Sequence, residues 1–219
     1  MSFHRADTAQ QSEPPGDCRI CPRLSAFRDA NIEEHSSWFN APVLSFGPAD
    51  SRVLIVGLAP GLKGANKTGR PFTGDYAGDL LYATLEKFNF SSGGYAGHAD
   101  DGLALKDCMI TNAVRCVPPQ NKPTGEEERH CRPFLAGRIA AMPRLSAILA
   151  LGRIAHDNTL AALGHRKSAC KFAHSAVHRL DDRLTLFDSY HCSRYNTNTR
   201  RLTVEMFEDV FVKITEHIR

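Results

Sequence analysis

Short apolar runs alternate along this chain with longer stretches in which apolar residues recur at helical spacing. The first run, Val53 to Val56, is rich in β-branched residues and suits a strand buried on both faces. Runs of similar character occupy 108–111, 147–151 and 184–187. Strands that alternate with helices form a parallel sheet covered on both sides. We therefore predict an α/β fold, a three-layer αβα sandwich around a central four-stranded parallel sheet.

Helices are predicted between and after these strands. Helical spacing and capping residues place them at 23–34, 76–88, 124–141, 153–163 and from Thr203 onward. Thr124, with Glu127 three positions later, resembles a capping box. The last helix has one apolar face, formed by Phe207, Phe211, Ile214 and Ile218. The polar segment 91–101 is expected to be a surface loop.

The amino-acid composition restricts the possible class of protein only slightly. The chain has 219 residues, of which 42% are hydrophobic, and its net charge of +3 permits an anionic partner without requiring one. Residues 1–17 are polar and close with Pro14, Pro15 and Gly16, so we expect a flexible N-terminal arm before a single domain at 18–219. No apolar run approaches the roughly 20 residues of a membrane span, and no signal-peptide pattern is present. These features predict a soluble intracellular protein.

The glycine-rich segment 57–82 follows the first strand, at the edge where open α/β sheets bind ligands. Gly57 and Gly61 allow a ligand to approach the backbone closely, Phe72 offers an aromatic face and Asp75 offers a carboxylate. The alternative is structural, with the glycines forming a turn and Asp75 only capping the next helix.

Residues 61–68, GLKGANKT, come close to a phosphate-binding P-loop. That motif requires glycine directly before the Lys-Thr pair, where this chain has Asn66. The sequence Gly-Arg-Pro at 69–71 also interrupts the helix that should follow and face the phosphates. We therefore reject a nucleotide hydrolase.

Seven cysteines in a chain without an export signal argue against a disulfide framework and for metal ligation or free thiols. Cys18 and Cys21 form a C-x2-C pair, and Cys116 and Cys131 bracket a loop far along the chain. Four thiolates from two separated segments can hold one metal centre and tie the N-terminal segment onto the domain. Zinc and a 4Fe-4S cluster both satisfy four cysteines, so the spacing leaves both open.

Polar residues also follow two other predicted strands. Asn112 comes directly after the second apolar run, and the fourth run delivers His191. A strand-end asparagine can serve a ligand or can merely satisfy a turn. The basic segment 165–179 faces phosphate or forms a solvated surface, and the sequence does not separate these two roles.

Four ordered motifs carry a resemblance to a known family. They read GLAPG at 57–61, GRPFTGDYAG at 69–78, ITNAVRCVPP at 110–119 and HCSRYNTNTRRLT at 191–203. With the cysteine pattern they resemble the uracil-DNA glycosylase superfamily, and most of all its bacterial and archaeal family five, the UDGb type. The resemblance runs from about Cys18 to the last helix. It implies a monomeric, cytoplasmic DNA-repair enzyme whose four cysteines hold a 4Fe-4S cluster.

The resemblance also assigns roles to residues. It implies hydrolysis of the N-glycosidic bond of uracil, and of hypoxanthine or other deaminated bases, in DNA after the nucleotide is everted. Phe72 would stack on the base and Asn112 would read its Watson-Crick edge. His191 would stabilise the departing base. The rest of the base-binding pocket would come from Gly57, Leu58, Ala59 and Gly61.

Two positions depart from related sequences. Better-known relatives carry a polar residue directly after the first glycine, whereas Leu58 here leaves Asp75 to position or deprotonate the attacking water. Cys192 stands where the family usually has proline, which favours a redox-sensitive thiol. The residues expected to contact DNA are Ser193, Arg194, Asn196, Arg200 and Arg201. The competing class is a non-catalytic, cysteine-ligated module that binds nucleic acid.

Overall fold

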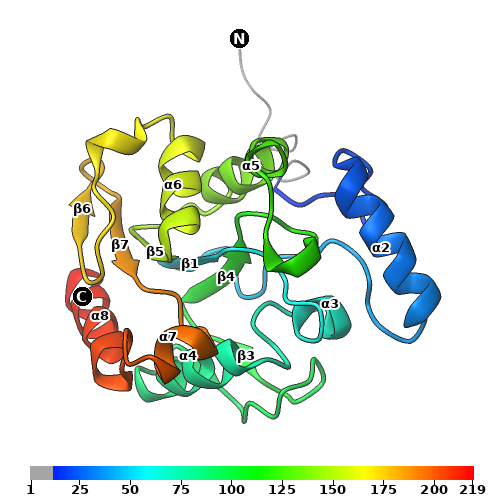
Figure 1. Ribbon diagram of the computed structural model, residues 1–219. Helices are drawn as coiled ribbons and strands as arrows, with labels where there is room; N and C mark the ends of the chain where they lie inside the picture. The colour runs from blue at the N-terminus through cyan, green and yellow to red at the C-terminus, as the bar shows by residue number, and fades with distance from the viewer. Residues whose placement is uncertain (1–11) are drawn as a thin grey trace.

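A computed structural model describes residues 12–219 as a sheet between two layers of helices (Figure 1). The sheet has five strands in the order β4-β1-β5-β7-β6. Four of them are parallel, namely β1 (Val53–Gly57), β4 (Cys108–Asn112), β5 (Ala147–Leu151) and β7 (Thr185–Ser189). The predicted α/β sandwich around four parallel strands is therefore confirmed.

Three short strands are missing from the sequence-based prediction. β6 (Val177–Arg179) adds an antiparallel fifth strand at the edge of the sheet, beside β7. The two-residue strands β2 (Ser91–Ser92) and β3 (Ala104–Leu105) pair with each other, and β2 lies where a surface loop is expected. None of the three has the apolar run or alternation that marks a strand in a sequence, because each is at most three residues long.

The helices begin and end close to the predicted positions. The long ones are α2 (Pro22–Glu34), α4 (Tyr76–Lys87), α5 (Gly125–Ala140), α6 (Arg153–Ala162) and α8 (Val204–His217). Short helical segments are α3 (Ala65–Thr68), η1 (Pro119–Asn121), η2 (Lys167–Ala169) and α7 (Arg194–Asn198). Thr124 and Glu127 form the predicted capping box of α5. Within residues 12–219, no helix is long and apolar enough to cross a membrane.

Alternate residues of the parallel strands enter two apolar cores, one on each face of the sheet. Ile55 of β1 packs in the core that includes Leu81 of α4 and Phe207 of α8. The preceding residue, Leu54, packs in the core that includes Leu135 of α5. All five side chains are fully buried, and each stabilises the fold by about 1.5–3 kcal/mol relative to exposure. Figure 1 shows α4 and α8 on one side of the sheet and α5 and α6 on the other.

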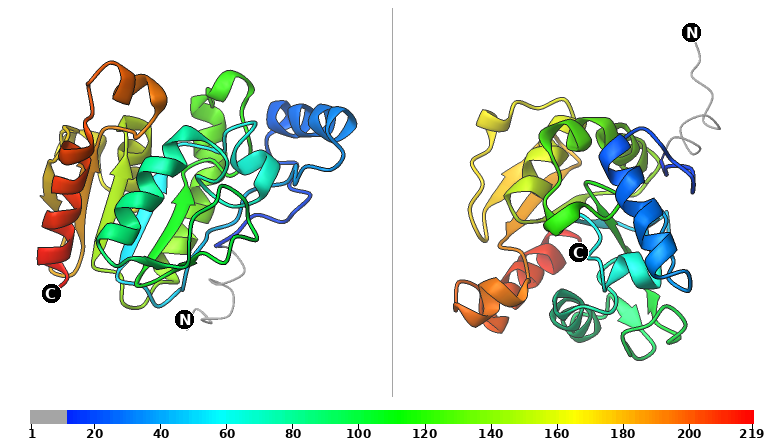
Figure 2. Two further views of the ribbon diagram at one scale, coloured as in Figure 1. Left: turned by 90° about the horizontal axis from the view of Figure 1, so that it is seen from below. Right: turned by 45° about the vertical axis from the view of Figure 1, so that its right-hand side comes forward.

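The register of the strands aligns their carboxyl ends. Gly57 of β1 lies opposite Asn112 of β4, and Leu151 of β5 lies opposite Ser189 of β7. Loops that leave these strands therefore emerge at one edge of the sheet, which is the ligand-binding edge in open α/β folds. In the left view of Figure 2 they gather at the upper end of the strands, below α7 and beside α3.

The expected N-terminal arm is partly packed. Residues 1–11 lie outside the described part of the chain, but Ser12 and Pro14 are buried. Glu13 accepts hydrogen bonds from Arg115 and Arg138, both at 2.7 Å. The prediction that the arm extends to residue 17 is wrong for residues 12–14, because the buried guanidinium of Arg115, 1% exposed, requires a carboxylate partner that no polarity pattern reveals.

We expect Glu13→Ala to destabilise the fold, because it leaves the buried Arg115 charge without its counter-ion. Loss of one partner of a buried pair costs roughly 3–5 kcal/mol, and the remaining bonds of Arg115 to Ser45 and Val43 place this case at the lower end. Urea unfolding monitored by circular dichroism measures the loss. The exposed Glu33→Ala is the matched control, and equal stability of the two variants would refute the assignment.

Candidate active site

A cavity of about 580 Å³ opens at the carboxyl edge of the sheet. Six of the seven predicted base-binding residues line it, and only Gly57 does not. The six are Leu58, Ala59, Gly61, Phe72, Asn112 and His191. Asp75, Ser193 and Arg194 line it as well. The structure therefore brings the aromatic ring, the carboxylate, the amide and the imidazole predicted from the motifs into one cavity.

Gly57 lies directly beneath this cavity and makes its geometry possible. A Cβ atom at residue 57 would lie 2.3 Å from Oδ1 of Asn112 and 2.6 Å from Cζ of Phe72, distances that real Cβ atoms do not reach. The Gly57 and Leu58 carbonyls also accept the N–H groups of Ala113 and Val114, at 2.9 and 3.0 Å. Glycine at the end of β1 therefore lets the amide and the ring converge while the two loops stay joined.

The amide of Asn112 is nearly buried, at 2% exposed, yet lines the cavity. Within residues 12–219, its side chain makes no hydrogen bond to protein. The amide therefore faces the cavity, where it can offer a ligand both donors and an acceptor. This observation favours the ligand-binding role of Asn112 over the turn role.

Phe72 is held in a strained conformation. Its φ of 53° is in the left-handed region, which costs a non-glycine residue about 1–3 kcal/mol. The backbone oxygen of Phe72 accepts a hydrogen bond from the Tyr95 hydroxyl at 3.3 Å. It also lies against Gly78, where a Cβ would be only 1.8 Å away. Tyr95, and Gly78 of α4, thus fix the backbone of Phe72. The plane of its ring lies 26° from that of His191 at a centroid distance of 5.8 Å.

His191 follows the end of β7, and its Nδ1 atom is buried without a hydrogen-bond partner. Burial lowers the pKa of His191 to about 4, so the imidazole is neutral at pH 7 and donates from only one nitrogen. Asn196 donates to the backbone oxygen of His191 at 2.8 Å and fixes the turn that carries the ring.

Asp75 caps α4 and also lines the cavity. Oδ1 accepts the N–H of Gly78 at 3.2 Å, as an N-cap of α4. Oδ2 lies against two glycines of the loop, where a Cβ would come within 2.5 Å at Gly64 and 3.0 Å at Gly61. Burial raises the pKa of Asp75, although the backbone N–H groups of α4 oppose the shift. The N-terminus of α4 thus holds the carboxylate at the wall of the cavity.

The four predicted cysteine ligands also come together. Cys18, Cys21, Cys116 and Cys131 line one small apolar cavity together with Leu24, Val114 and Phe134. Burial raises the pKa of Cys21 to about 11 and that of Cys116 to about 12, and the charges of the neighbouring thiols add to both shifts. Such thiols remain protonated at pH 7 unless a metal takes the place of the proton.

Arg115 and Arg28 place hydrogen-bond donors beside these four cysteines. The N–H of Arg115 donates to the sulfur of Cys131 at 3.2 Å. Arg28 donates from Nη2 to the Cys18 carbonyl at 2.9 Å, while its Nη1 is buried without a partner. The charge of Arg28 also acts to lower the pKa of Cys116, which places the guanidinium beside the thiols. The surroundings therefore suit a negatively charged, sulfur-rich group.

A buried network behind His191 is absent from the sequence analysis. Asp188 of β7 bonds Nδ1 of His156 at 2.7 Å and Nε2 of His178 at 3.0 Å. Nε2 of His156 faces the Cys170 carbonyl at 3.0 Å. Both ring nitrogens of His156 therefore face acceptors, which requires an imidazolium. Burial by itself lowers the pKa of His156, but Asp188 and the Cys170 carbonyl outweigh it, and the pKa is raised.

The spacing in this network is that of hydrogen bonds and not of a metal site. Zinc bound to a nitrogen and an oxygen at about 2.0–2.1 Å in a tetrahedral site would hold them about 3.3 Å apart. The Nδ1–Oδ1 distance of 2.7 Å between His156 and Asp188 is too short. The network instead anchors β7 three residues before His191. No spacing rule marks it, because its members come from α6, β6 and β7.

Two of the five predicted DNA-contacting residues lie at the 580 Å³ cavity, two line a neighbouring cavity, and one lines neither. Ser193 caps α7, and Arg194 lies 5.3 Å above the Tyr76 ring at the rim of the 580 Å³ cavity. Asn196 and Arg201 line a second, neighbouring cavity, and Arg200 is exposed.

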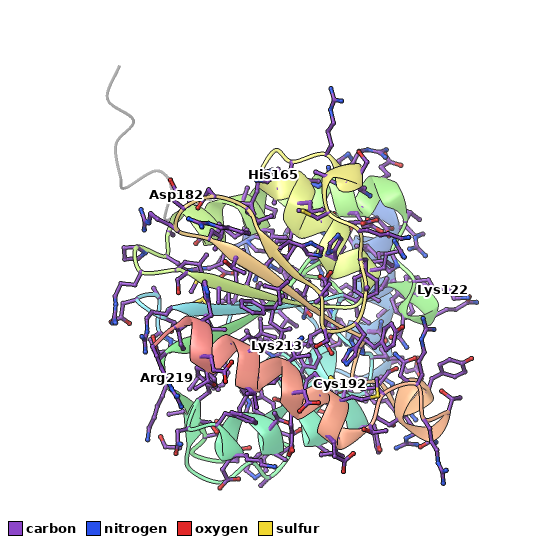
Figure 3. All side chains as sticks on the ribbon, turned by 90° about the vertical axis from the view of Figure 1, so that its left-hand side faces the viewer. Lys122, His165, Asp182, Cys192, Lys213 and Arg219 are labelled. Atoms are coloured by element: carbon purple, nitrogen blue, oxygen red, sulfur yellow. The ribbon has the colours of Figure 1, made fainter. Side chains whose placement is uncertain are left out.

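The expectation of a redox-sensitive Cys192 is wrong. Its side chain is fully buried, and Sγ donates to the Ala77 carbonyl at 3.4 Å. Burial raises the pKa of the thiol, so the reactive thiolate does not form at neutral pH. Cys192, labelled in Figure 3, lies where the chain leaves the sheet for α7.

The fold and the cavity define an α/β protein that gathers an aromatic ring, an amide, an imidazole and a carboxylate in one cavity at a sheet edge. The profile of the Uracil DNA glycosylase superfamily matches residues 44–215. The chain belongs to this superfamily.

Individual relatives are similar over most of the chain. The Type-5 uracil-DNA glycosylase of Thermus thermophilus is 44% identical over 90% of this chain and 91% of its own length. The Type-5 uracil-DNA glycosylase of Pyrobaculum aerophilum is 38% identical over 89% of this chain and 86% of its own. The Type-4 uracil-DNA glycosylase of Thermotoga maritima is 37% identical over 52% of this chain.

We expect the free energy of unfolding to fall as the pH rises, because His156 then loses its proton and its ion pair with Asp188. Its pKa is raised in the folded state, so its contribution is complete below the unfolded value of about 6.5 and is lost as pH rises through the folded value. The unfolding free energy of the native chain, measured in urea between pH 6 and pH 9, should therefore fall towards that of His156→Gln. The exposed His98→Gln should parallel the native chain, and a pH-independent gap between native and His156→Gln would contradict the imidazolium.

Proposed function

We propose that this protein is a uracil-DNA glycosylase of DNA repair, which hydrolyses the N-glycosidic bond between uracil and deoxyribose and leaves an abasic site. The convergence of Phe72, Asp75, Asn112 and His191 on one cavity carries the proposal. The similarity to Type-5 uracil-DNA glycosylases supports it. The proposal includes a monomer that acts on chromosomal DNA in the cytoplasm.

Recognition begins with eversion of the nucleotide, because a stacked base cannot enter the cavity. The Phe72 ring stacks on one face of the base, at the position that its strained backbone fixes. The Asn112 amide then bonds the Watson-Crick edge through an oxygen acceptor and a nitrogen donor. Both groups are placed before the substrate arrives, so little reorganisation opposes binding.

Departure of the base puts negative charge on the ring and positive charge on the sugar. Neutral His191 donates one hydrogen bond to the charged base, and an oriented donor of this kind lowers the barrier by about 3–4 kcal/mol. Because the imidazole is neutral, it stabilises the departing base through a hydrogen bond and does not protonate the base before the glycosidic bond breaks. Because the pKa of His191 is about 4, this donor keeps one protonation state between pH 5 and pH 8.

The attacking water is assigned to Asp75. Leu58 has no polar atom on its side chain, and Asp75 is the carboxylate that lines the cavity. Its Oδ2 accepts a hydrogen bond from water, which places the water oxygen towards the sugar carbon as the base leaves. The negative charge of Asp75 also stabilises the positive sugar.

The apolar Leu58 extends the proposal to other substrates. A side chain without hydrogen-bonding groups imposes no donor or acceptor pattern at that wall of the cavity. Hypoxanthine and other deaminated bases are therefore proposed as further substrates beside uracil.

We also infer that Cys18, Cys21, Cys116 and Cys131 hold a 4Fe-4S cluster. Four thiolates on a single zinc ion at about 2.3 Å lie about 3.8 Å from one another. In the described part of the chain, no three of these sulfurs lie within 4.8 Å of one another, whereas a cluster binds each thiolate to a different iron. The N–H of Arg115 and the free Nη1 of Arg28 are suitable donors to such a group.

When bound, the cluster supplies metal–thiolate bonds that join the Cys18–Cys21 segment to the loop and helix that carry Cys116 and Cys131. These bonds fasten the start of α2 to the domain next to the loop that follows Asn112.

Incubation with a uracil-containing oligonucleotide, followed by alkali, tests the reaction. We expect strand cleavage by the native protein, and Asp75→Ala should lower single-turnover rates by about 100-fold or more with DNA affinity within a few-fold of native. Asp75→Asn, which keeps the cap of α4 but cannot take a proton, separates general base from water positioner. Binding without cleavage would establish the non-catalytic module instead, and full activity of Asp75→Ala would remove Asp75 from the mechanism.

Cluster content is tested on protein purified without oxygen. We expect a brown protein with a broad absorption band at about 400 nm and four irons and four sulfides per chain. Cys116→Ser should abolish the band, and Cys170→Ser, a partly exposed cysteine outside the set, should retain it. One equivalent of zinc in place of iron would overturn the assignment.

A further inference from the structure

The segment 93–103 joins β2 to β3 and has no role in the mechanism above. Most of it falls where the sequence predicts a surface loop. Its tyrosine, Tyr95, bonds to residues 72–74, which we call the stacking turn because they include Phe72. Tyr95 does not line the 580 Å³ cavity. Any effect of Tyr95 on a ligand in that cavity therefore passes through the stacking turn.

The Tyr95 hydroxyl lies between two backbone groups of the stacking turn. It donates to the Phe72 oxygen at 3.3 Å and accepts the N–H of Gly74 at 3.2 Å. Phe72 and Gly74 both have positive φ, of 53° and 85°, so the backbone bends sharply at both residues. One hydroxyl thus satisfies a carbonyl and an N–H on either side of the residue between them. It fixes the bend that places the Phe72 ring at the cavity wall.

The position of the Tyr95 ring is itself set by packing. The ring stacks on that of Tyr82 in α4, with a centroid distance of 4.5 Å and an angle of 24° between the planes. The guanidinium of Arg70 lies 5.8 Å from the centre of the Tyr95 ring. Gly78 of α4 leaves room for the hydroxyl, because a Cβ there would lie 2.7 Å from its oxygen. The hydroxyl therefore has little freedom to leave the turn.

A buried ion pair joins the segment 93–103 to the glycine-rich loop. Nη1 and Nη2 of Arg70 donate to the two carboxylate oxygens of Asp101, each at 2.7 Å, and the two side chains are 5% and 0% exposed. Asp101 also accepts the N–H groups of Ala96 and Leu103, at 2.9 and 3.1 Å. The bonds from Arg70 lower the pKa of Asp101, so the pair stays charged at neutral pH.

This ion pair already fastens the segment to the domain, so the Tyr95 hydroxyl is not needed for that purpose. Within residues 12–219, both hydrogen bonds of the hydroxyl go to the stacking turn. A strained residue such as Phe72 keeps its conformation only where its surroundings hold it there. The two bonds from Tyr95 act at the point of strain.

We propose that Tyr95 is a positioning residue of the glycosylase reaction, whose hydroxyl holds the Phe72 ring where the ring stacks on the everted base. The inference rests on the proposed function, because it is the everted base that gives the ring its role. A ring that is fixed before the base arrives loses no freedom when the base stacks on it. Tyr95 therefore stabilises the everted state and not the first contact with DNA.

Single-turnover kinetics on a uracil oligonucleotide test Tyr95→Phe, which keeps the stacked ring and removes only the hydroxyl. We expect the rate at saturating protein to fall by about 3- to 30-fold, the effect of one or two hydrogen bonds, with the Kd for DNA within about 2-fold of native. DNA affinity is retained because it comes mainly from contacts to phosphate.

Thr84→Val is the matched control. It also removes one hydroxyl, which donates to the Leu80 oxygen at 2.8 Å on a residue of α4 that is 2% exposed and does not line the cavity. Urea unfolding measures the loss of stability in both variants. We expect Thr84→Val to lose stability and to keep the native rate.

A double-mutant cycle tests whether Tyr95 acts through Phe72. Once Phe72→Ala has removed the ring, we expect Tyr95→Phe to change the rate by less than about 2-fold, because nothing is left to position. If the two substitutions multiplied their effects in the double variant, Tyr95 would act on the fold in general and the proposal would be wrong.

Eversion can also be measured without catalysis. The probe is an oligonucleotide with 2′-fluoro-2′-deoxyuridine, which resists cleavage, next to 2-aminopurine, whose fluorescence rises when its neighbour leaves the stack. At saturating protein we expect a smaller rise with Tyr95→Phe than with the native chain, and the native rise with Thr84→Val.

The possible failures are distinct. A native protein that releases no uracil would refute the proposed function itself. Normal uracil release, with Tyr95→Phe matching Thr84→Val in rate and in fluorescence, would overturn the role of Tyr95 alone. A weaker Kd for DNA at an unchanged saturating rate would overturn it as well.

Discussion

The parallel pairing of β1 with β4 is the constraint on which the site depends. It sets Gly57 opposite Asn112, and the missing side chain at residue 57 leaves room for the Asn112 amide and the Phe72 ring to meet above the strand end. A shift of one residue in this register would point the Asn112 side chain into an apolar core and remove its amide from the cavity. The geometry of recognition thus follows from backbone hydrogen bonds between two fully buried strands.

Burial then sets the electrostatics of the cavity. It keeps His191 neutral and raises the pKa of Asp75, whereas the backbone N–H groups at the start of α4 favour the carboxylate form of Asp75. Behind the site the histidine is charged instead, because Asp188 stabilises the imidazolium form of His156. A charged anchor under β7 and an uncharged ring at its end are compatible because only the anchor has a counter-ion.

Much of the fold could be predicted because buried parallel strands are short apolar runs and helices carry caps. The motif residues of the first cavity were also predictable, since each follows a strand or lies in the glycine-rich loop. The pairing of Glu13 with Arg115 was not, because an ion pair across about a hundred residues leaves no local pattern. The burial of Cys192 was not predictable for a similar reason, because the local sequence does not show whether a cysteine lies in an exposed loop or in a core.

The amino-acid sequence by itself determined the four parallel strands, the capped helices and the identity of the groups that line the first cavity. Only the tertiary structure decided the protonation of His191 and His156 and the contact of the Tyr95 hydroxyl with the backbone of Phe72. The physical reason is the separation along the chain of the residues that interact. Strand and helix patterns are written in neighbouring residues, whereas desolvation, ion pairs and shared cavity walls depend on segments that meet only after the chain has folded.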